Sequence, residues 1–286
     1  MTVRALALSI CSVLASPTYA QDVVILGEVH DNPAHHAEQA ARVARTRPKA
    51  IVFEMLTAEQ AARVTPQVWG NEAELEAALG WAESGWPDFS MYYPIFAAAP
   101  EAEIYGVQVP RDAARAVIAD GPAASFGEEA ARYGLDRDLP PQEQTARETL
   151  QKEAHCNALP AEMLPGMVAI QRLRDAVLAR AAIEALEATG GPVVVITGNG
   201  HARRDWGVPR TAARSTAGLT SSRARLRSSA PTPARRSSDP AHPCAAPAAA
   251  LVSGRKSQGA AMLSSKRILL IIGGGIAAYK SLELIR

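Results

Sequence analysis

The sequence predicts an α/β fold, a mainly parallel β-sheet flanked by helices with an added helical region, and two observations lead to it. First, four short apolar runs rich in Val and Ile are each bounded by polar or turn residues, which is typical of strands buried on both faces. Second, the segments between these runs have helical patterns, and strands that alternate with helices form parallel sheets. The four predicted strands are residues 23–26, 50–53, 103–109 and 192–197.

The helices between these strands are indicated by their ends and their periodicity. Asn32 followed by Pro33 predicts an N-cap and a first turn for a helix over about residues 33–47. The longest helix is expected within residues 160–188, ending at the pair Gly190-Gly191. Further helical patterns occupy residues 57–64, 71–83 and 111–119.

The first 20 residues have the layout of a cleaved export signal. Arg4 precedes a short apolar run, and a small residue, Ala20, stands at the expected cleavage point. The run is too short to span a membrane. We therefore expect a signal peptide at residues 1–20 and a periplasmic or otherwise exported protein whose folded domain covers residues 21–209.

The chain after this domain has a different composition. Residues 207–261 contain nine Lys and Arg against one acidic residue, and no Ile, Phe, Tyr, Trp or Met. Such a segment can bury too little apolar surface to offset the entropy cost of ordering its backbone, so we expect residues 210–261 to be a disordered tail. No aromatic residues interleave with the arginines, and we expect no nucleic-acid partner.

A regular pattern returns at the end of the chain. In residues 262–286, the apolar run 268–272 leads into three glycines, Gly273 to Gly275, and the start of a helix. This arrangement is typical of phosphate cradles, and the segment resembles the opening of the flavoprotein phosphopantothenoylcysteine decarboxylase and synthetase. One strand and a partial helix cannot form a flavin site. We interpret the tail and this fragment as the product of a frameshift that reads into the next gene.

Polar side chains follow each of the four predicted strands. His30, Glu54, Arg111 and His201 come after the first, second, third and fourth strand, and both histidines belong to a G-x-x-H pattern. Because ligands of open α/β sheets bind beyond the carboxyl ends of the strands, these four side chains are expected to converge around one cavity.

The chemistry of this group has two interpretations. His30, Glu54 and His201 could form a two-histidine, one-carboxylate set for a divalent metal such as Zn, Fe or Mn. Alternatively, Glu28 or Glu54 could orient a histidine for proton transfer. His35 and His36, on the first turn of the following helix, are expected to bond to nearby backbone and to face solvent or a partner.

Six of the 14 aromatic residues of the chain crowd together in residues 80–100. One interpretation is a core helix with Phe89, Tyr92 and Phe96 on one face. The other is an apolar platform for a planar ligand, with a tyrosine oxygen as an iron ligand. The residues alone favour the core helix.

Five motifs in residues 22–209 resemble the ChaN family of haem-binding uptake proteins, within the Tiki, TraB and erythromycin-esterase-like superfamily. They are ILGEVHDNPAHH, FEM, WPDFSMYYPIF, VPRD and ITGNGHARRDWGVP. The resemblance implies an exported protein of iron uptake that binds haem at a homodimer interface, with a tyrosine on the iron and with outer-membrane haem or iron uptake components as partners. The residues it implies for haem binding are Trp86, Phe89, Tyr92, Tyr93, His30 and His201.

The identity of the tyrosine ligand stays open at this point. The tyrosine of the family's Y-x-P pattern falls on Tyr92, which makes it the expected iron ligand, and Tyr93 stands where other members often have arginine. The wider superfamily resemblance implies an alternative, a hydrolase of peptide or ester bonds that uses His30, Glu54, Arg111 and His201. We expect a haem-binding protein rather than an enzyme and keep the hydrolase as the alternative.

Overall fold

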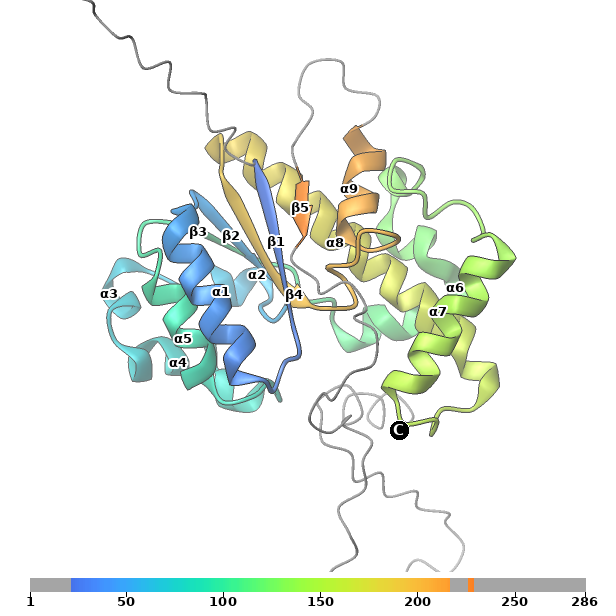
Figure 1. The fold of residues 1–286 in the computed structure, drawn as a ribbon, viewed down its shortest axis with the longest axis horizontal. Helices are drawn as coiled ribbons and strands as arrows, with labels where there is room; N and C mark the ends of the chain where they lie inside the picture. The colour runs from blue at the N-terminus through green and yellow to red at the C-terminus, as the bar shows by residue number, and fades with distance from the viewer. Residues whose placement is uncertain (1–21, 217–225, 229–286) are drawn as a thin grey trace, which may run out of the picture.

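The computed structural model describes residues 22–216 and 226–228, which form a parallel β-sheet covered by helices on both faces (Figure 1). The order of the strands in the sheet is β3-β2-β4-β1-β5, and every neighbouring pair is parallel. The predicted α/β class is therefore confirmed. The strands are β1 (Val23–Glu28), β2 (Ala50–Phe53), β3 (Glu103–Gly106), β4 (Val193–Gly198) and β5 (Leu226–Ser228).

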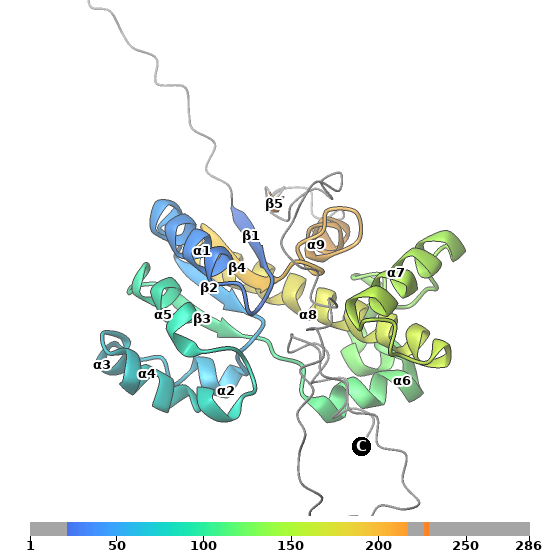
Figure 2. The same cartoon turned by 60° about the horizontal axis from the view of Figure 1, so that its bottom comes forward.

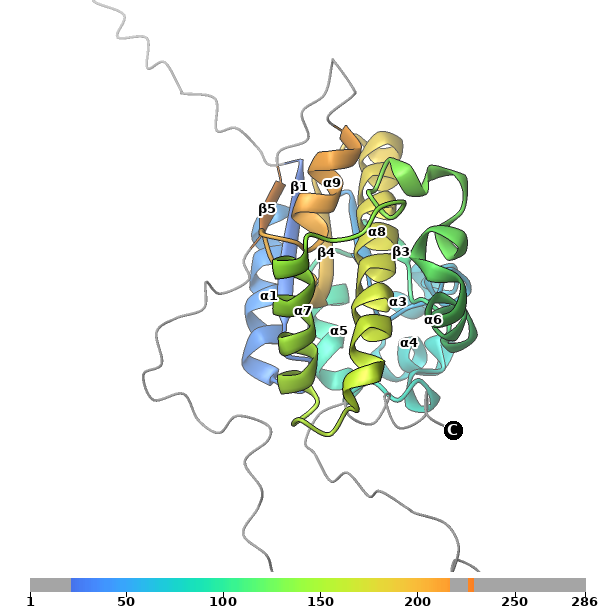
Figure 3. The ribbon, with the colours of Figure 1, turned by 90° about the vertical axis from the view of Figure 1, so that its right-hand side faces the viewer.

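The helices form two groups, one on each face of the sheet (Figure 2). Helices α6 and α7 pack mainly against α8 and not against the sheet, and the three lie together in Figure 3. Helices α6 and α7 are the added helical region. The first group is α1 (Pro33–Thr46), α2 (Ala58–Ala61), α3 (Pro66–Trp69), α4 (Glu72–Leu79) and α5 (Phe89–Ala97); the second is α6 (Arg111–Phe126), α7 (Pro141–Ala154), α8 (Leu164–Thr189) and α9 (Val208–Thr216).

The central strands are apolar on both sides because both faces of the sheet are covered. In β4, Val193 and Val195 pack in the core beside α8, whereas Val194 and Ile196 pack in the core beside α5. All six residues of β4 are buried. This double burial explains why the strand appears in the sequence as a continuous apolar run and not as an alternating pattern.

Two predicted helix boundaries are confirmed. The side chain of Asn32 caps α1 by accepting a hydrogen bond from the backbone N–H of Ala34 at 3.0 Å, and Pro33 occupies the first helical position. Helix α8 is the longest described helix, and Gly190 closes it in the left-handed conformation with φ of 72°.

We expect Asn32→Ala to lower the free energy of unfolding by about 1 kcal/mol, because the substitution removes the capping acceptor. Urea unfolding followed by circular dichroism measures the change. Gln67→Ala, at an exposed residue of α3, is the control and should change stability by less than about 0.5 kcal/mol. Equal effects at both positions would contradict the capping role.

The structure differs from the prediction at the third strand and at α7. The third strand ends at Gly106 and not at residue 109, because the chain there turns toward the loop before α2, where the Gln108 N–H bonds to the Leu56 carbonyl at 2.7 Å. A Cβ on Gly106 would lie 2.1 Å from the Thr57 carbonyl oxygen, so this approach requires glycine. Helix α7 was not predicted, since its one buried residue, Arg147, leaves no apolar stripe in the sequence.

Part of the segment predicted to be disordered has regular structure. Helix α9 continues to Thr216, and β5 pairs with β1. Helix α9 packs against α8 and buries the small residues Ala212 and Ser215, so it needs none of the large apolar side chains whose lack suggested disorder. The remainder of that segment, the predicted signal peptide and residues 262–286 lie outside the described residues. Within the described part of the chain, no helix combines the length and hydropathy needed to cross a bilayer.

Candidate functional site

The carboxyl edge of the sheet brings together side chains from three strand ends. Glu28 ends β1, Glu54 follows β2, and His30 and His201 follow β1 and β4. A Cβ on Gly198, the last residue of β4, would lie 3.1 Å from His30 Nε2 and 3.8 Å from Glu54 Oε2. The glycine of the second G-x-x-H pattern therefore leaves the space in which His30 and Glu54 approach each other.

Glu28 is the centre of one buried cluster. Its Oε1 accepts hydrogen bonds from His30 Nδ1 at 2.7 Å and from the Tyr92 hydroxyl at 2.9 Å. Its Oε2 lies 3.3 Å from Nδ1 of His36. The side chain of His30 is 23% exposed, so it connects this buried carboxylate to the protein surface.

The structure corrects the prediction for His36. This residue is fully buried, and its Nε2 donates a hydrogen bond to the His30 carbonyl at 2.8 Å. His36, Gln39 and Val43 are the buried residues of α1, and their spacing of three and four places His36 on the inward face of the helix. His35 is half-buried and accepts a hydrogen bond from the Val29 N–H at 2.9 Å, the local backbone contact that was expected.

Glu54 and His201 form a second buried cluster. Glu54 Oε2 accepts hydrogen bonds from Thr197 Oγ1 at 2.7 Å and from the Gly198 N–H at 2.8 Å, and its Oε1 lies 3.6 Å from His201 Nε2. His201 Nδ1 donates to Asp175 Oδ1 at 2.7 Å. Asp175 lies on α8, so His201 is held between two carboxylates from different parts of the chain.

Burial and charge act in opposite directions on this cluster. Burial alone would raise the pKa of Glu54, but the charges of His201 and His30 and the two hydrogen bonds hold that pKa well below its ordinary value. Burial alone would lower the pKa of His201, but Glu54 and Asp175 raise it above the ordinary value. For Asp175 burial prevails, and its pKa is raised. The imidazolium form of His201 is therefore stabilised by its carboxylate neighbours.

Two arginines are relevant to this site, one selected in the sequence and one not. Arg111 is exposed at the first residue of α6. The arginine whose charge acts on both Glu54 and Asp175 is Arg174 of α8, and burial lowers its pKa. The sequence signal for both missed residues was the pair Arg174-Asp175, charged residues in the middle of a mostly apolar helix.

The donor arrangement does not fit the predicted divalent-metal set. Among the residues that the structure describes, no group of three or more His, Cys, Asp or Glu side chains is disposed to hold a metal ion. His30 and His201 each donate from Nδ1 to a carboxylate, Glu28 and Asp175, and Glu54 Oε2 accepts from Thr197.

The aromatic segment forms a core helix, as its residue pattern indicated. Phe89, Tyr92 and Phe96 of α5 are buried. The Tyr92 ring lies between Trp81, at a ring distance of 4.8 Å, and His36, at 4.3 Å. Burial and, next, the Glu28 carboxylate raise the pKa of Tyr92 far above that of a free phenol.

Two other aromatic residues are more accessible. Tyr93 is half-buried and packs beside Phe89 at a ring distance of 6.2 Å. Trp86 is half-buried and contacts His30 edge-on at 4.9 Å. Next to His30 in the chain, Val29 is 44% exposed. The rim of the sheet therefore carries an apolar and aromatic surface above the buried cluster of Glu28.

One comparison with known proteins identifies a family. A sequence profile of the family described as "Haem-binding uptake, Tiki superfamily, ChaN" matches residues 14–211. A search of curated protein sequences found no match.

Two solved structures are similar to the chain. The structure titled "Cofacial heme binding to ChaN of Campylobacter jejuni" is 18% identical, and the match covers 66% of this chain and 75% of that chain with a TM-score of 0.47. The type III effector HopBA1 is 14% identical, and the match covers 63% of this chain and 67% of that chain with a TM-score of 0.34.

Proposed function

This chain belongs to the haem-binding uptake family of the Tiki superfamily that includes ChaN, and on that basis we propose that it binds haem as an exported protein of iron or haem uptake. The family match supports the proposal most strongly, because it spans strands β1 to β4 and α5. We propose outer-membrane haem or iron uptake components as its partners.

The accessible part of the rim suits a flat apolar ligand. Val29, His30 and Trp86 offer an apolar edge, and Tyr93 adds a phenol on α5. When bound, haem would supply an iron for which a phenolate oxygen is an established protein ligand. Two other residues expected to contact haem, Phe89 and His201, are buried, so we leave them out of the proposed surface.

We propose Tyr93, and not Tyr92, as the residue that reaches the iron. The Tyr92 hydroxyl is directed inward, toward Glu28, and the carboxylate opposes loss of its proton. The Tyr93 side chain is half-exposed on the same helix. A haem on this surface would still present its second face, and a second copy of the chain could cover that face in a homodimer.

Titration of the purified full chain with haemin tests the proposal. A saturable change of the Soret band is expected, and sedimentation velocity with and without haemin should show a dimer in the loaded sample. A chain that gives no saturable spectral change does not bind haem, and that result would remove the proposed function.

A second candidate function, hydrolysis of an ester or peptide bond, is favoured by one observation. The His201 and Asp175 pair lines a cavity of about 30 Å³. A cavity of this volume has room for water. Only the neutral form of His201, whose population grows as the pH rises, could act here: Asp175 would orient its ring, and the ring would take a proton from the water.

Hydrolysis of p-nitrophenyl acetate tests this second candidate. If the pair is catalytic, Asp175→Asn should lower the rate about a hundredfold, whereas Gln67→Ala, at an exposed residue of α3, should leave the rate unchanged. Circular dichroism checks that both variants fold. A rate equal to that of buffer, or one unaffected by Asp175→Asn, would eliminate hydrolysis by this pair.

A further inference from the structure

Arg174 is a cation without a bonded partner at the carboxyl edge of the sheet. It lies in the middle of α8 and is half-buried. Its charge acts on Glu54 and Asp175, and it also acts on His201. The guanidinium nevertheless forms no hydrogen bond, and no ion pair within 4 Å, with any of the residues that the structure describes.

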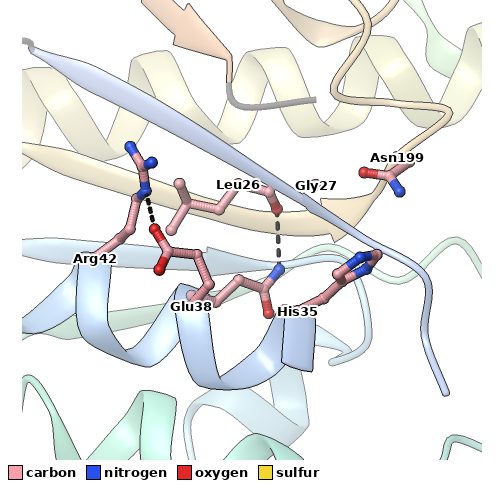
Figure 4. Close-up of a pocket in the computed structure, with 7 residues that line it drawn as sticks. Leu26, Gly27, His35, Glu38, Arg42 and Asn199 are labelled. Carbon is pink, nitrogen blue, oxygen red and sulfur yellow. Dashed lines mark hydrogen bonds and ion pairs between the residues drawn. The ribbon is translucent and has the colours of Figure 1, made fainter. Parts of the chain in front are cut away.

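Charged side chains beside two cavities of the protein are, by contrast, already paired. A pocket of about 220 Å³ between β1 and α1 is lined by Glu38 and Arg42, which form an ion pair at 2.7 Å (Figure 4). Beside the smaller cavity of about 30 Å³, Arg147 bonds to Glu143 at 2.6 Å. Burial removes water from a charge, and a bonded partner is needed to offset that loss. Arg174 has lost water without gaining a partner, and burial accordingly lowers its pKa.

Glu54 offers an acceptor in the same region. Its Oε2 accepts two hydrogen bonds, whereas Oε1 accepts none from the described part of the chain and has His201 Nε2 at 3.6 Å. The pKa of Glu54 is held low, so this carboxylate is ionised at neutral pH. Because Glu54 and Arg174 form no ion pair, more than 4 Å separates their charged atoms. A ligand that bonds to both would therefore bridge them.

His30 supplies a second acceptor beside Glu54. Its Nδ1 donates to the Glu28 carboxylate at 2.7 Å, so in the neutral ring Nε2 carries the lone pair. The side chain is 23% exposed, so a ligand can reach it. His30 Nε2 lies 3.1 Å, and Glu54 Oε2 3.8 Å, from the point that a Cβ on Gly198 would occupy. The two acceptors therefore lie close together at the end of β4.

We propose that this edge of the sheet binds a free α-amino acid, whose carboxylate accepts hydrogen bonds from Arg174 and whose ammonium group donates to Glu54 Oε1 and His30 Nε2. The planar guanidinium can bond to both oxygens of a carboxylate. A simple anion is disfavoured, because the carboxylates of Glu28 and Asp175 also lie near this edge, whereas a zwitterion adds no net charge. A simple amine would leave Arg174 without a partner. The inference depends on neither haem binding nor hydrolysis.

L-Alanine, propionate and L-alaninamide form a matched set of probes, because propionate lacks the ammonium group and alaninamide lacks the carboxylate. The chain contains six histidines, so the imidazole C–H resonances of the full chain can be followed by NMR and assigned by substitution. At neutral pH, L-alanine is expected to shift the His30 and His201 signals saturably. Propionate and alaninamide should each bind at least about tenfold more weakly. No saturable shift with L-alanine, or equal binding of the three probes, would overturn the proposal.

A substitution of Arg174 separates this site from general weak binding. Arg174→Met removes the guanidinium and keeps an unbranched side chain. It should weaken L-alanine binding at least about tenfold and leave the binding of alaninamide unchanged, since only the carboxylate contacts Arg174. Arg45→Met, at an exposed residue of α1, is the matched control and should bind L-alanine as the parent chain does.

The same variant distinguishes a ligand-binding arginine from a structural one. Arg174 has no bonded partner to lose, so urea unfolding should show that Arg174→Met is as stable as the parent chain. A folded Arg174→Met that binds L-alanine with unchanged affinity would overturn the assignment. If Arg174→Met does not fold, Arg174→Lys takes its place. It keeps the charge but not the planar fork, so it should weaken L-alanine binding about fivefold, and unchanged binding would overturn the assignment in the same way.

Discussion

Replacing Tyr93 by phenylalanine is expected to lower the affinity for haemin at least about a hundredfold. Substitution of residues that hydrogen-bond to metal ligands already costs about 10 to 100-fold in metal affinity, and loss of a ligand itself should cost no less. Tyr93 is only half-buried and the substitution removes one oxygen atom, so the stability of the fold should be almost unchanged. Haemin titration followed at the Soret band measures the affinity, and urea unfolding checks the stability.

Tyr92→Phe is the matched control for this prediction. It removes the hydroxyl that donates to Glu28 at 2.9 Å, so it should lower the free energy of unfolding by about 1.5 to 3 kcal/mol, the range for a hydrogen bond to a charged group. Haemin affinity should change less than threefold. The reverse result, in which Tyr92→Phe abolishes binding and Tyr93→Phe does not, would make Tyr92 the iron ligand.

The parts of the fold that could be predicted are those whose burial produces a recognisable apolar pattern in the sequence. Strands β1, β2 and β4 are buried on both faces, so continuous apolar runs revealed them nearly to their ends. Helix α7 buries Arg147 alone, and α9 packs through small residues. Neither helix has a run of large apolar residues, and both pack against α8.

The site was predictable to a similar extent. The positions of His30, Glu54 and His201 follow from parallel topology, because strand ends meet at one edge. Their partners come from helices. Asp175 contacts His201, and Tyr92 contacts Glu28, because of where α8 and α5 pack on the sheet. No local pattern in the sequence specifies those packing positions.

His201→Ala is expected to lower the free energy of unfolding by about 3 to 5 kcal/mol at neutral pH. The substitution removes the partner of two buried carboxylates, Glu54 at 3.6 Å and Asp175 at 2.7 Å, and breaking a buried ion pair from one side costs about this much. Urea unfolding at several pH values measures the loss. A loss below about 1 kcal/mol would mean that His201 is not the cation that balances this cluster.

The pH dependence distinguishes this charge effect from the cavity that the substitution also leaves. The pKa of His201 is raised in the folded protein, so its stabilisation is fully present below its ordinary value of 6.5 and is lost as the pH rises through the folded value. The pKa of Glu54 is lowered, so its contribution is present above 4.5 and is lost in acid. The parent chain should therefore lose stability toward alkaline pH, and His201→Ala should show less of that loss.

His155 is a suitable control, because burial lowers its pKa and its Nδ1 donates to a backbone carbonyl, that of Gln151, and not to a carboxylate. Its contribution to stability rises with pH through 6.5, so His155→Ala should leave the alkaline loss intact, and a cavity alone would make the two variants alike.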